Sequence, residues 1–450
     1  IIHTNFNTVT KMKVLKFGGT SVGSAQRMKE VAKLITDGEK KIVVLSAMSG
    51  TTNTLVEISD YLYKKNPEGA NEIINKLETK YKQHIDELFA TPEYKQKGLE
   101  IIKSHFDYIR SYTKDLFTLF EEKVVLAQGE LISTAMVNFY LQECGVKSVL
   151  LPALEFMRTD KNAEPDPIYI KEKLLAQLEL YPDADIYITQ GFICRNAYGE
   201  IDNLQRGGSD YTASLIGAAI NASEIQIWTD IDGMHNNDPR IVDKTAPVRQ
   251  LHFEEAAELA YFGAKILHPT CIQPAKYANI PVRLLNTMDP EAPGTLISND
   301  TEKGKIKAVA AKDNITAIKI KSSRMLLAHG FLRKVFEIFE SYQTSIDMIC
   351  TSEVGVSVTV DNTKHLNEIL DDLKKYGTVT VDKEMCIICV VGDLEWENVG
   401  FEAKALDAMR DIPVRMISFG GSNYNISFLI RECDKKVALQ SLSDMLFNGK

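Results

Sequence analysis

The chain has no long uninterrupted hydrophobic run and no excess of positive charge. Spanning a bilayer takes about 18 or more continuous apolar residues, and no segment of the sequence reaches that length. The 52 basic and 61 acidic residues give a net charge of −9, without a basic stripe that would track a phosphate backbone. We therefore expect neither a membrane nor a nucleic acid as partner. No secretory pattern opens the chain, so we expect the cytoplasm.

Cysteine and histidine are few and scattered. Seven cysteines, an odd number in 450 residues, do not resemble a disulfide framework, so reduced thiols are expected. Cys386 and Cys389 form a CxxC pair, but the apolar residues between and after them predict a buried strand. The eight histidines include no HExxH or comparable ligand spacing, and no protein-bound metal site is expected.

At this length the chain is expected to form two or three domains. From Lys13 to about Asn299, buried strands alternate with amphipathic helices, which predicts an open, largely parallel sheet covered on both faces. The expected strands are Val14 to Phe17, Ile42 to Leu45, Ser148 to Leu151, Asp185 to Ile193, Glu224 to Thr229 and Val282 to Leu285. The stretch from Glu57 to Lys123 predicts a helical insertion. Prolines, glycines and charge from Asp289 to Lys305 predict a linker.

The remainder of the chain contains an internal repeat. Gly330-Phe331 and Gly400-Phe401 each precede a helical pattern, and SIDMIC at 345 parallels VRMISF at 414. A repeat of roughly 70 residues predicts two copies of a small βαββαβ module. The strand expected from Ile306 to Lys312 can complete the second copy. Two such sheets side by side would leave clefts for small molecules.

A strand-ending lysine followed by two glycines stands in KFGGTS, Lys16 to Ser21. Gly18 and Gly19 lack a Cβ and let backbone N–H groups approach an anion, while Lys16 supplies a mobile charge. The helix signal that begins at Ser24 adds positive potential. The run matches neither the Walker pattern nor the GxGxxG fingerprint. Taken alone, it fits a phosphate cradle or an ordinary tight turn.

A second glycine pair occurs in RGGSD, Arg206 to Asp210, before the helical run YTASLIGAAI. Gly207 and Gly208 would let the backbone come close to an oxygen ligand, and Ser209 or Asp210 can cap the helix. A capped loop is therefore one interpretation. The planar fork of Arg206 suits a carboxylate, which favours an amino acid substrate instead.

Four further segments carry polar groups. WTDIDG and DPR, between Trp228 and Arg240, can contact a nucleotide, although Asp-Gly and Asp-Pro also favour turns. SAMSGTTN, Ser46 to Asn53, carries small hydroxyl residues suited to carboxylate or phosphate. Glu130, in QGE, can meet a cationic amino group or lie in the first turn of a helix. Lys265, in FGAKILHP, is either a further cation of the site or a solvated lysine.

Together these motifs occur in the order seen in aspartokinases of the amino acid kinase superfamily, with QGF at Gln190 to Phe192 among them. The resemblance spans the chain from Met12. Its tail is similar to the tandem ACT modules of the lysine-sensitive, single-chain type. The implied α/β fold is a three-layer αβα sandwich of the amino acid kinase (carbamate kinase-like) type, followed by two βαββαβ ferredoxin-like ACT modules. The implied domains are a catalytic domain at 12–299, a linker and strand at 300–312, and ACT modules at 313–383 and 384–450.

The resemblance implies ATP-dependent phosphorylation of the L-aspartate β-carboxylate to 4-phospho-L-aspartate, the first step of lysine, threonine and methionine biosynthesis. Mg²⁺ would be held mainly by the ATP phosphates. The implied catalytic residues are Lys16, Asp210 and Lys265. The implied ATP positions are Lys16, Gly18, Gly19, Thr20, Ser21, Thr229, Asp230, His235, Arg240 and Lys265. The implied substrate positions are Ser49, Thr52, Glu130, Phe192, Arg206 and Ser209. His235 departs from the tyrosine that many relatives carry in TDxxGxY.

The ACT tail implies feedback regulation by an end-product amino acid, with L-lysine expected, in a homodimer or higher homo-oligomer joined through these modules. Asp347 matches the position that pairs the effector's ammonium group. The surrounding cleft positions are Met325, Gly330, Phe331, Leu332, Ser345, Ile346, Ser352 and Glu353. Ala328 stands where lysine-sensitive relatives often carry serine.

Two other functions are open to a chain of this kind. A glutamate or N-acetylglutamate kinase shares the fold, but RGGSD with GE and a double ACT tail argues against it. A catalytically silent subunit that only senses amino acids would not need both Lys16 and Asp210, which this sequence retains.

Overall fold

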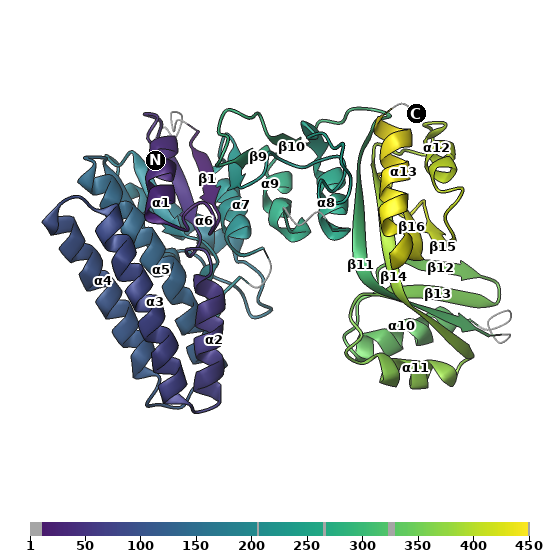
Figure 1. Ribbon diagram of the computed structural model, residues 1–450, viewed down its shortest axis with the longest axis horizontal. Coiled ribbons are helices and arrows are strands. Elements are labelled where there is room, and N and C mark those ends of the chain that lie inside the picture. Colours follow the sequence, from purple (N-terminus) through teal and green to yellow (C-terminus); the bar gives the residue numbers. More distant parts are fainter. Residues whose placement is uncertain (1–10, 205–206, 264–266, 323–328, 449–450) are drawn as a thin grey trace, which may run out of the picture. The chain divides into compact units, whose positions relative to one another are not determined.

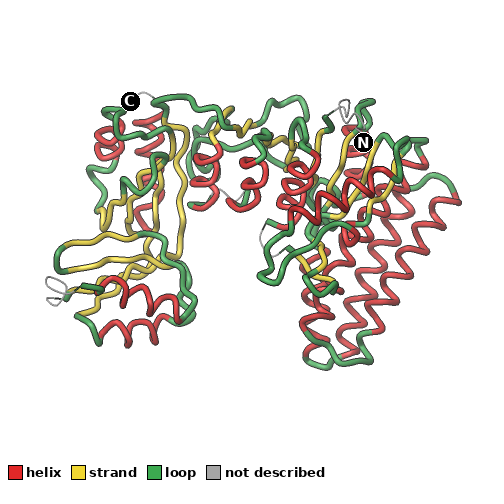
Figure 2. The backbone as a smooth tube through the Cα atoms, turned by 180° about the vertical axis from the view of Figure 1, so that it is seen from behind, coloured by secondary structure: helices red, strands yellow, loops and turns green. Residues whose placement is uncertain are grey.

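The computed structural model describes residues 11–204, 207–263, 267–322 and 329–448. The chain forms two compact units (Figures 1 and 2). The first contains the chain up to Met234 together with Leu267–Asn299. The second contains His235–Ile266 and Asp300–Lys450.

The first unit is built on a largely parallel sheet, as the sequence predicts. Its strands lie in the order β3-β4-β2-β1-β7-β9-β10, and only β10 is antiparallel to its neighbour β9. Their bounds are β1 Lys13–Phe17, β2 Lys41–Leu45, β3 Ser148–Leu151, β4 Ile186–Gln190, β7 Ile225–Thr229, β9 Val282–Asn286 and β10 Thr295–Ser298. Every residue of β2 is buried, as expected for a strand covered on both faces.

Helices cover both faces of this sheet. Leu15 and Phe17 of β1 belong to one core with Met28 of α1 and Ile132 of α5, and α7 packs against β1 from the other face. This arrangement confirms the αβα sandwich. The helices of the unit are α1 Ala25–Ile35, α2 Thr51–Tyr63, α3 Pro67–Leu88, α4 Pro92–Ser111, α5 Leu119–Glu143, α6 Pro167–Glu179, α7 Gly208–Ile220 and α9 Gln273–Tyr277, with short 3₁₀ turns at Ala153–Glu155 and Pro269–Ile272.

The helical insertion is longer than expected. Helices α2 to α5 extend it from Thr51 to Glu143, and these four helices lie side by side in Figure 1. Among the described helices, α5 is long and apolar enough to cross a membrane by length and composition, yet 72% of its apolar window is buried inside the protein. Burial of that kind is typical of the core helix of a soluble protein.

Two other expectations about strands are wrong in detail. The strand expected over Asp185–Ile193 ends at Gln190, because Phe192 has a φ of 67° and turns the chain into β5, Ile193–Arg195. β5 then pairs with β6, Ile201–Asn203, as a small hairpin. The expected linker contains β10, whose Thr295 is buried.

The second unit contains one six-stranded sheet in the order β12-β13-β11-β14-β16-β15. The bounds are β11 Ile306–Lys321, β12 Ile349–Ser352, β13 Gly355–Val360, β14 Thr378–Gly392, β15 Val414–Ser418 and β16 Asn425–Arg431. Its helices are α10 Phe331–Ser341, α11 Leu366–Lys374, α12 Phe401–Ala408 and α13 Lys435–Phe447, and a 3₁₀ turn covers Glu432–Asp434. The short strand β8, Gln250–His252, leads into α8, Phe253–Tyr261, which packs against β11 and β14.

Both βαββαβ modules share this sheet, whereas two separate sheets were expected. The first half of β11 pairs with the end of β14, and its second half pairs with both β13 and the start of β14. Each of these two long strands contains a residue with positive φ, Asn314 at 59° and Glu384 at 55°. The register shifts near both residues. The bulges therefore let one pair of strands serve two hydrophobic cores.

Candidate active site and effector cleft

A cleft of about 320 Å³ opens in the first unit where β1, β2 and β4 end. Parallel strands bring their carboxyl ends to one edge of a sheet, and ligands of such folds bind there. The cleft is lined by Gly19, Ser46, Ala47, Met48, Ser49, Gly50, Thr52, Asn53, Glu130, Phe192, Gly208 and Ser209. This set includes every residue predicted for the substrate except Arg206, which lies outside the described residues.

Lys16 and Asp210 meet beside this cleft. Lys16 lies on β1 and Asp210 in the first turn of α7, and the Lys16 Nζ and Asp210 Oδ1 atoms are 2.7 Å apart. Their side chains are 11% and 16% exposed, so the pair is largely shielded yet open to a ligand. The other predicted catalytic residue, Lys265, lies outside the described residues.

The cap expected for α7 is wrong. Gly207 occupies the N-cap position with a φ of 70°, and neither Ser209 nor Asp210 makes a capping hydrogen bond. Any Cβ on Gly207 would lie 1.7 Å from Cys271 Sγ. The glycine pair therefore serves close packing and a left-handed turn, which leaves Ser209 and Asp210 directed to other partners.

The glycine loop after β1 packs directly on the loop after β2. A Cβ on Gly19 would lie 2.8 Å from the Ala47 carbonyl oxygen, and the Ser49 amide donates a 3.1 Å hydrogen bond to the Gly19 carbonyl. Thr20 is exposed. The Ser21 hydroxyl is buried and lies 2.8 Å from the Thr287 hydroxyl, so it contacts protein rather than solvent.

Glu130 is a buried carboxylate with one open oxygen. It lies in the middle of α5, so the interpretation that placed it in a first helical turn is wrong. Its Oε1 accepts a 3.2 Å hydrogen bond from the Ala47 amide, while Oε2 has no partner among the described residues. The residue is 3% exposed, and burial raises its pKa to about 7. An unpaired buried oxygen of this kind is costly unless a ligand satisfies it.

Residues outside the predicted substrate set line or support the cleft. The Ser46 hydroxyl donates to the Ser209 hydroxyl at 2.8 Å, and the Ser133 hydroxyl donates to the Ser46 carbonyl at 2.8 Å. Gly191 is required here because its Cβ would lie 2.3 Å from Ser209 Oγ. Ser46 and Asn53 stand inside the SAMSGTTN motif, which was the available signal; no local pattern points to Ser133.

The predicted nucleotide residues fall in both units. Thr229 and Asp230 follow one another at the carboxyl end of β7, where the Thr229 hydroxyl bonds locally with Ile231 and Asp230 is exposed. In the second unit, His235 Nδ1 lies 2.9 Å from the Thr245 hydroxyl. Arg240 is 75% exposed and forms a fork with Asp238, at 2.9 Å from Nε and 2.7 Å from Nη2.

The described residues contain no group of three or more histidine, cysteine, aspartate or glutamate side chains that could hold a metal ion. The nearest carboxylate to Lys16 is already paired with it. The Asp210 carboxylate is an oxygen donor of the type that Mg²⁺ accepts.

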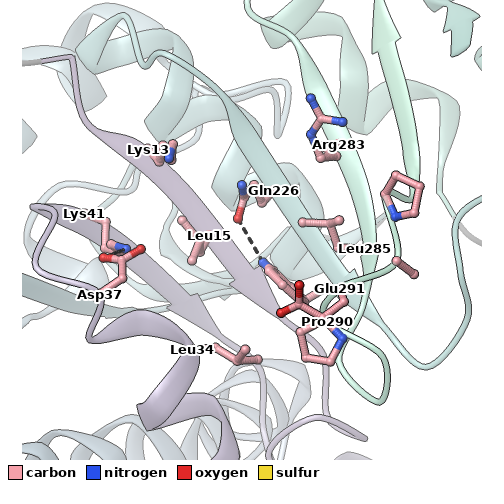
Figure 3. A pocket seen from close by; sticks show the side chains of 13 residues that line it. Lys13, Leu15, Leu34, Asp37, Lys41, Gln226, Arg283, Leu285, Pro290 and Glu291 are labelled. Atoms are coloured by element: carbon pink, nitrogen blue, oxygen red, sulfur yellow. Dashed lines mark hydrogen bonds and ion pairs between the residues drawn. The ribbon is translucent and has the colours of Figure 1, made fainter. Parts of the chain in front are cut away.

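A second cavity of about 390 Å³ lies on one face of the same sheet (Figure 3). Several of its polar residues are already paired: Lys41 pairs with Asp37, Arg283 Nε lies 3.0 Å from Glu224 Oε2, and the Trp228 indole donates to Gln226. Among the described residues, none of those predicted for the site lines this cavity. We therefore assign the chemistry to the smaller cleft.

Asp347, one of the predicted effector residues, has an enclosed side chain. Its side chain is 1% exposed, and its Oδ1 accepts from Lys312 Nζ at 2.7 Å and from the Tyr261 hydroxyl at 3.0 Å. Its Oδ2 has no partner among the residues that the structure describes.

The other predicted effector positions differ widely in exposure. Gly330 is the N-cap of α10, and Phe331 is buried in the core of the first module. Leu332, Ser345, Ser352 and Glu353 are exposed, and Ile346 is half-buried. Met325 and Ala328 lie outside the described residues.

Comparison with known proteins identifies the chain. The model of the amino acid kinase family matches residues 11–286, and a model of the ACT domain matches residues 388–446. Aspartokinase 1 of Arabidopsis thaliana is 36% identical over 97% of this chain and 80% of its own length. The chain belongs to the aspartokinases of the amino acid kinase family.

Solved aspartokinases have the same fold. The crystal structure of Escherichia coli aspartokinase III in complex with aspartate and ADP matches with a TM-score of 0.84 and 32% identity, covering 97% of this chain and 100% of that one. The structure of that enzyme in complex with lysine and aspartate matches with a TM-score of 0.79 and 33% identity, covering 97% and 99%. The predicted αβα sandwich with ACT modules is thereby confirmed.

Proposed function

We propose that this aspartokinase transfers the γ-phosphoryl group of ATP to the β-carboxylate of L-aspartate, giving 4-phospho-L-aspartate and ADP. This reaction is the first step toward lysine, threonine and methionine. The observation that carries the proposal is the cleft, where the open oxygen of Glu130 lies among hydroxyl groups beside the Lys16 and Asp210 pair.

The substrate carboxylate is already ionised, so it attacks phosphorus without a general base. Catalysis then depends on positioning and on neutralising charge. Glu130 Oε2 accepts from the α-ammonium group of aspartate, and Arg206 holds its α-carboxylate. Thr52, Ser49 and Ser209 donate hydroxyl hydrogen bonds, and Phe192 closes the wall of the cleft.

Lys16 neutralises the phosphoryl group during transfer, and Asp210 orients the Lys16 ammonium. The backbone of Gly18, Gly19 and Thr20 approaches the phosphates, with Ser21 holding the loop through Thr287. The other nucleotide positions that the resemblance implies are Thr229, Asp230, His235, Arg240 and Lys265. Mg²⁺ supplies further charge neutralisation when bound with ATP.

Lysine is the proposed effector, and the structure of the E. coli enzyme in complex with lysine and aspartate supports this choice. Asp347 would pair an ammonium group of lysine through its open oxygen. We further propose that the enzyme is cytoplasmic and that it assembles as a homodimer, or a higher homo-oligomer, through its ACT modules.

The deciding experiment is a coupled ADP-release assay with aspartate, glutamate and N-acetylglutamate, with hydroxylamine trapping of the acyl phosphate. Lys16→Ala should lower kcat by about 10²-fold or more, because one preorganised charge at the transferring group is lost. Lys13→Ala is the matched control on the same strand, since Lys13 pairs with Glu39 at the surface. Near-normal turnover in Lys16→Ala, or faster turnover of glutamate than of aspartate, would refute the proposal.

A further inference from the structure

Phe192, which lines the substrate cleft, has a strained backbone. Its φ of 67° lies in the left-handed region, which a bulky side chain rarely adopts. Across it the Ile193 amide donates to the Gly191 carbonyl at 2.7 Å, so these three residues form a γ-turn of the rare, strained kind. Such a backbone persists only where other groups hold it, and it occurs often at functional sites. On one side of the residue, the Phe192 carbonyl accepts from the Leu204 amide at 2.7 Å.

The Thr212 hydroxyl holds the other side of Phe192. Thr212 lies on α7 and is 0% exposed, and its Oγ1 accepts a 3.0 Å hydrogen bond from the Phe192 amide. The same hydroxyl donates to the Gly208 carbonyl at 3.3 Å. Because the amide needs an acceptor and the carbonyl needs a donor, a hydroxyl group satisfies both at once. It thereby joins the turn at Phe192 to the first residue of α7.

The two segments that Thr212 joins also pack tightly on one another. A Cβ on Gly208 would lie 3.3 Å from Phe192 Cδ2, and a Cβ on Gly191 would lie 2.3 Å from Ser209 Oγ. Phe192, Gly208 and Ser209 all line the cleft. The places of the Phe192 ring and of the Ser209 hydroxyl therefore depend on one contact surface, and Thr212 supplies hydrogen bonds across it.

We propose that Thr212 is a positioning residue for the substrate: its hydroxyl holds the Phe192 backbone in the left-handed conformation and thereby places the wall of the cleft against aspartate. This inference rests on the proposed aspartate kinase activity. Thr212 is not one of the residues that line the cleft, so it acts through Phe192. Without its hydroxyl, the Phe192 amide loses its acceptor and the strained turn relaxes. The cleft then binds aspartate less tightly, while phosphoryl transfer to the bound substrate continues.

Thr212→Val tests this proposal, because valine is similar in shape to threonine but lacks the hydroxyl. The KM for aspartate should rise by about 10-fold, the size of effect expected when one buried amide is left without its partner. Both kcat and the KM for ATP should stay within about 2-fold of the wild type, since only binding of aspartate is weakened. Thr212→Ser keeps the hydroxyl and should retain a KM near that of the wild type. Steady-state kinetics of the full chain, with each substrate varied in turn, would measure these constants.

Thr189→Val is the matched control. Thr189 lies on β4, three residues before Phe192, and is also 0% exposed, but its hydroxyl has no hydrogen-bond partner among the described residues. The same substitution there should leave all three kinetic constants unchanged. Thr212→Ala is a second variant, which removes the hydroxyl without adding an atom to the core, and it should also raise the KM for aspartate. A merely structural role of Thr212 would instead reduce the amount of active enzyme, and hence kcat, at an unchanged KM.

The outcomes separate this inference from the function on which it rests. If the wild-type chain phosphorylates no aspartate, the proposed function itself fails. If the wild type is active and the variants without the hydroxyl keep its KM for aspartate, only the positioning role is overturned. The same follows if Thr212→Ser raises this KM as much as Thr212→Val does. A raised KM in Thr212→Val and Thr212→Ala, with Thr212→Ser and Thr189→Val near the wild type, supports the role.

Discussion

At the residue scale, Glu130 links burial to pH dependence. Its carboxylate must be ionised to pair the ammonium group of aspartate, yet burial raises its pKa to about 7. Because kcat/KM reports ionisations of the free enzyme, kcat/KM for aspartate should fall as the pH drops below about 7. In Glu130→Gln this fall of kcat/KM at low pH should disappear. The value of kcat/KM should also be lower by roughly 30-fold or more, because one buried charge partner is lost. A wild-type profile retained in Glu130→Gln would exclude this role.

The same residue should limit stability at high pH. The folded-state pKa of about 7 lies above the ordinary value of 4.5. The unfolded chain therefore binds fewer protons between these values, and the free energy of unfolding falls as the pH rises through them. The difference between the two pKa values corresponds to a loss of at most about 3 kcal/mol in the free energy of unfolding. This loss is complete above pH 7.

Glu130→Gln should accordingly be more stable than the wild type at pH 8 and similar to it at pH 4.5, where the native carboxyl is protonated. Thermal unfolding of the two proteins at both pH values would measure this. Gln128→Glu is a reciprocal variant on the same helix, since Gln128 is likewise buried, and it should show the opposite trend. Equal stabilities of Glu130→Gln and the wild type at pH 8 would contradict the raised pKa.

Whether a single residue of the site could be predicted depends on how far its contact partners lie from it along the sequence. Lys16 and Glu130 stand in short motifs with a recognisable chemistry. The hydrogen bond between Ser46 and Ser209 joins positions 163 apart, and the contact of Ser21 with Thr287 joins positions 266 apart. Only the folded sheet brings such partners together, so no local pattern could indicate them.

At the scale of elements, the geometry of the site depends on two loops that touch backbone to backbone. Gly19→Ala places a Cβ 2.8 Å from the Ala47 carbonyl oxygen, which a rigid backbone cannot move aside without cost. The glycine loop and the SAMSGTTN loop must then separate. A misplacement of this size should lower kcat/KM by about 10- to 100-fold with either substrate varied. Steady-state kinetics would measure the loss.

Gly421→Ala is the control for this substitution, because no atom lies within 4 Å of its added Cβ. Its kinetics should match those of the wild type. If Gly19→Ala behaved in the same way, the close approach of the two loops would not position the site.

Element boundaries were harder to predict than element types. The strand expected from Ile306 ends at Lys312, and the implied first ACT module begins at residue 313. In the structure Asn314 forms a bulge and β11 continues to Lys321, since positive φ in one residue bends a strand without ending it. Sequence periodicity gives the two halves but not their continuity, which depends on pairing with β14.

At the scale of the whole molecule, the shared strands make the two ACT modules one folding unit. β14 pairs with β16 in the second module and with β11 along both of its halves, while β13 pairs with β11 and β12 in the first. Each module has a hydrophobic core of its own. A loss of packing in one core should therefore reach the other through β11 and β14.

Phe428→Ala tests this cooperativity. Phe428 is 0% exposed on β16 within the core of the second module, and its truncation should cost about 3–5 kcal/mol. Hydrogen exchange should then show lower protection of the β13 amides in the first module together with those of β16, while β2 in the first unit keeps its protection. Phe336→Ala, at a phenylalanine 39% exposed on α10, should change little. Loss of protection confined to β15 and β16 would mean that the bulges at Asn314 and Glu384 separate the modules energetically, so that a signal from the effector cleft could not use the shared sheet.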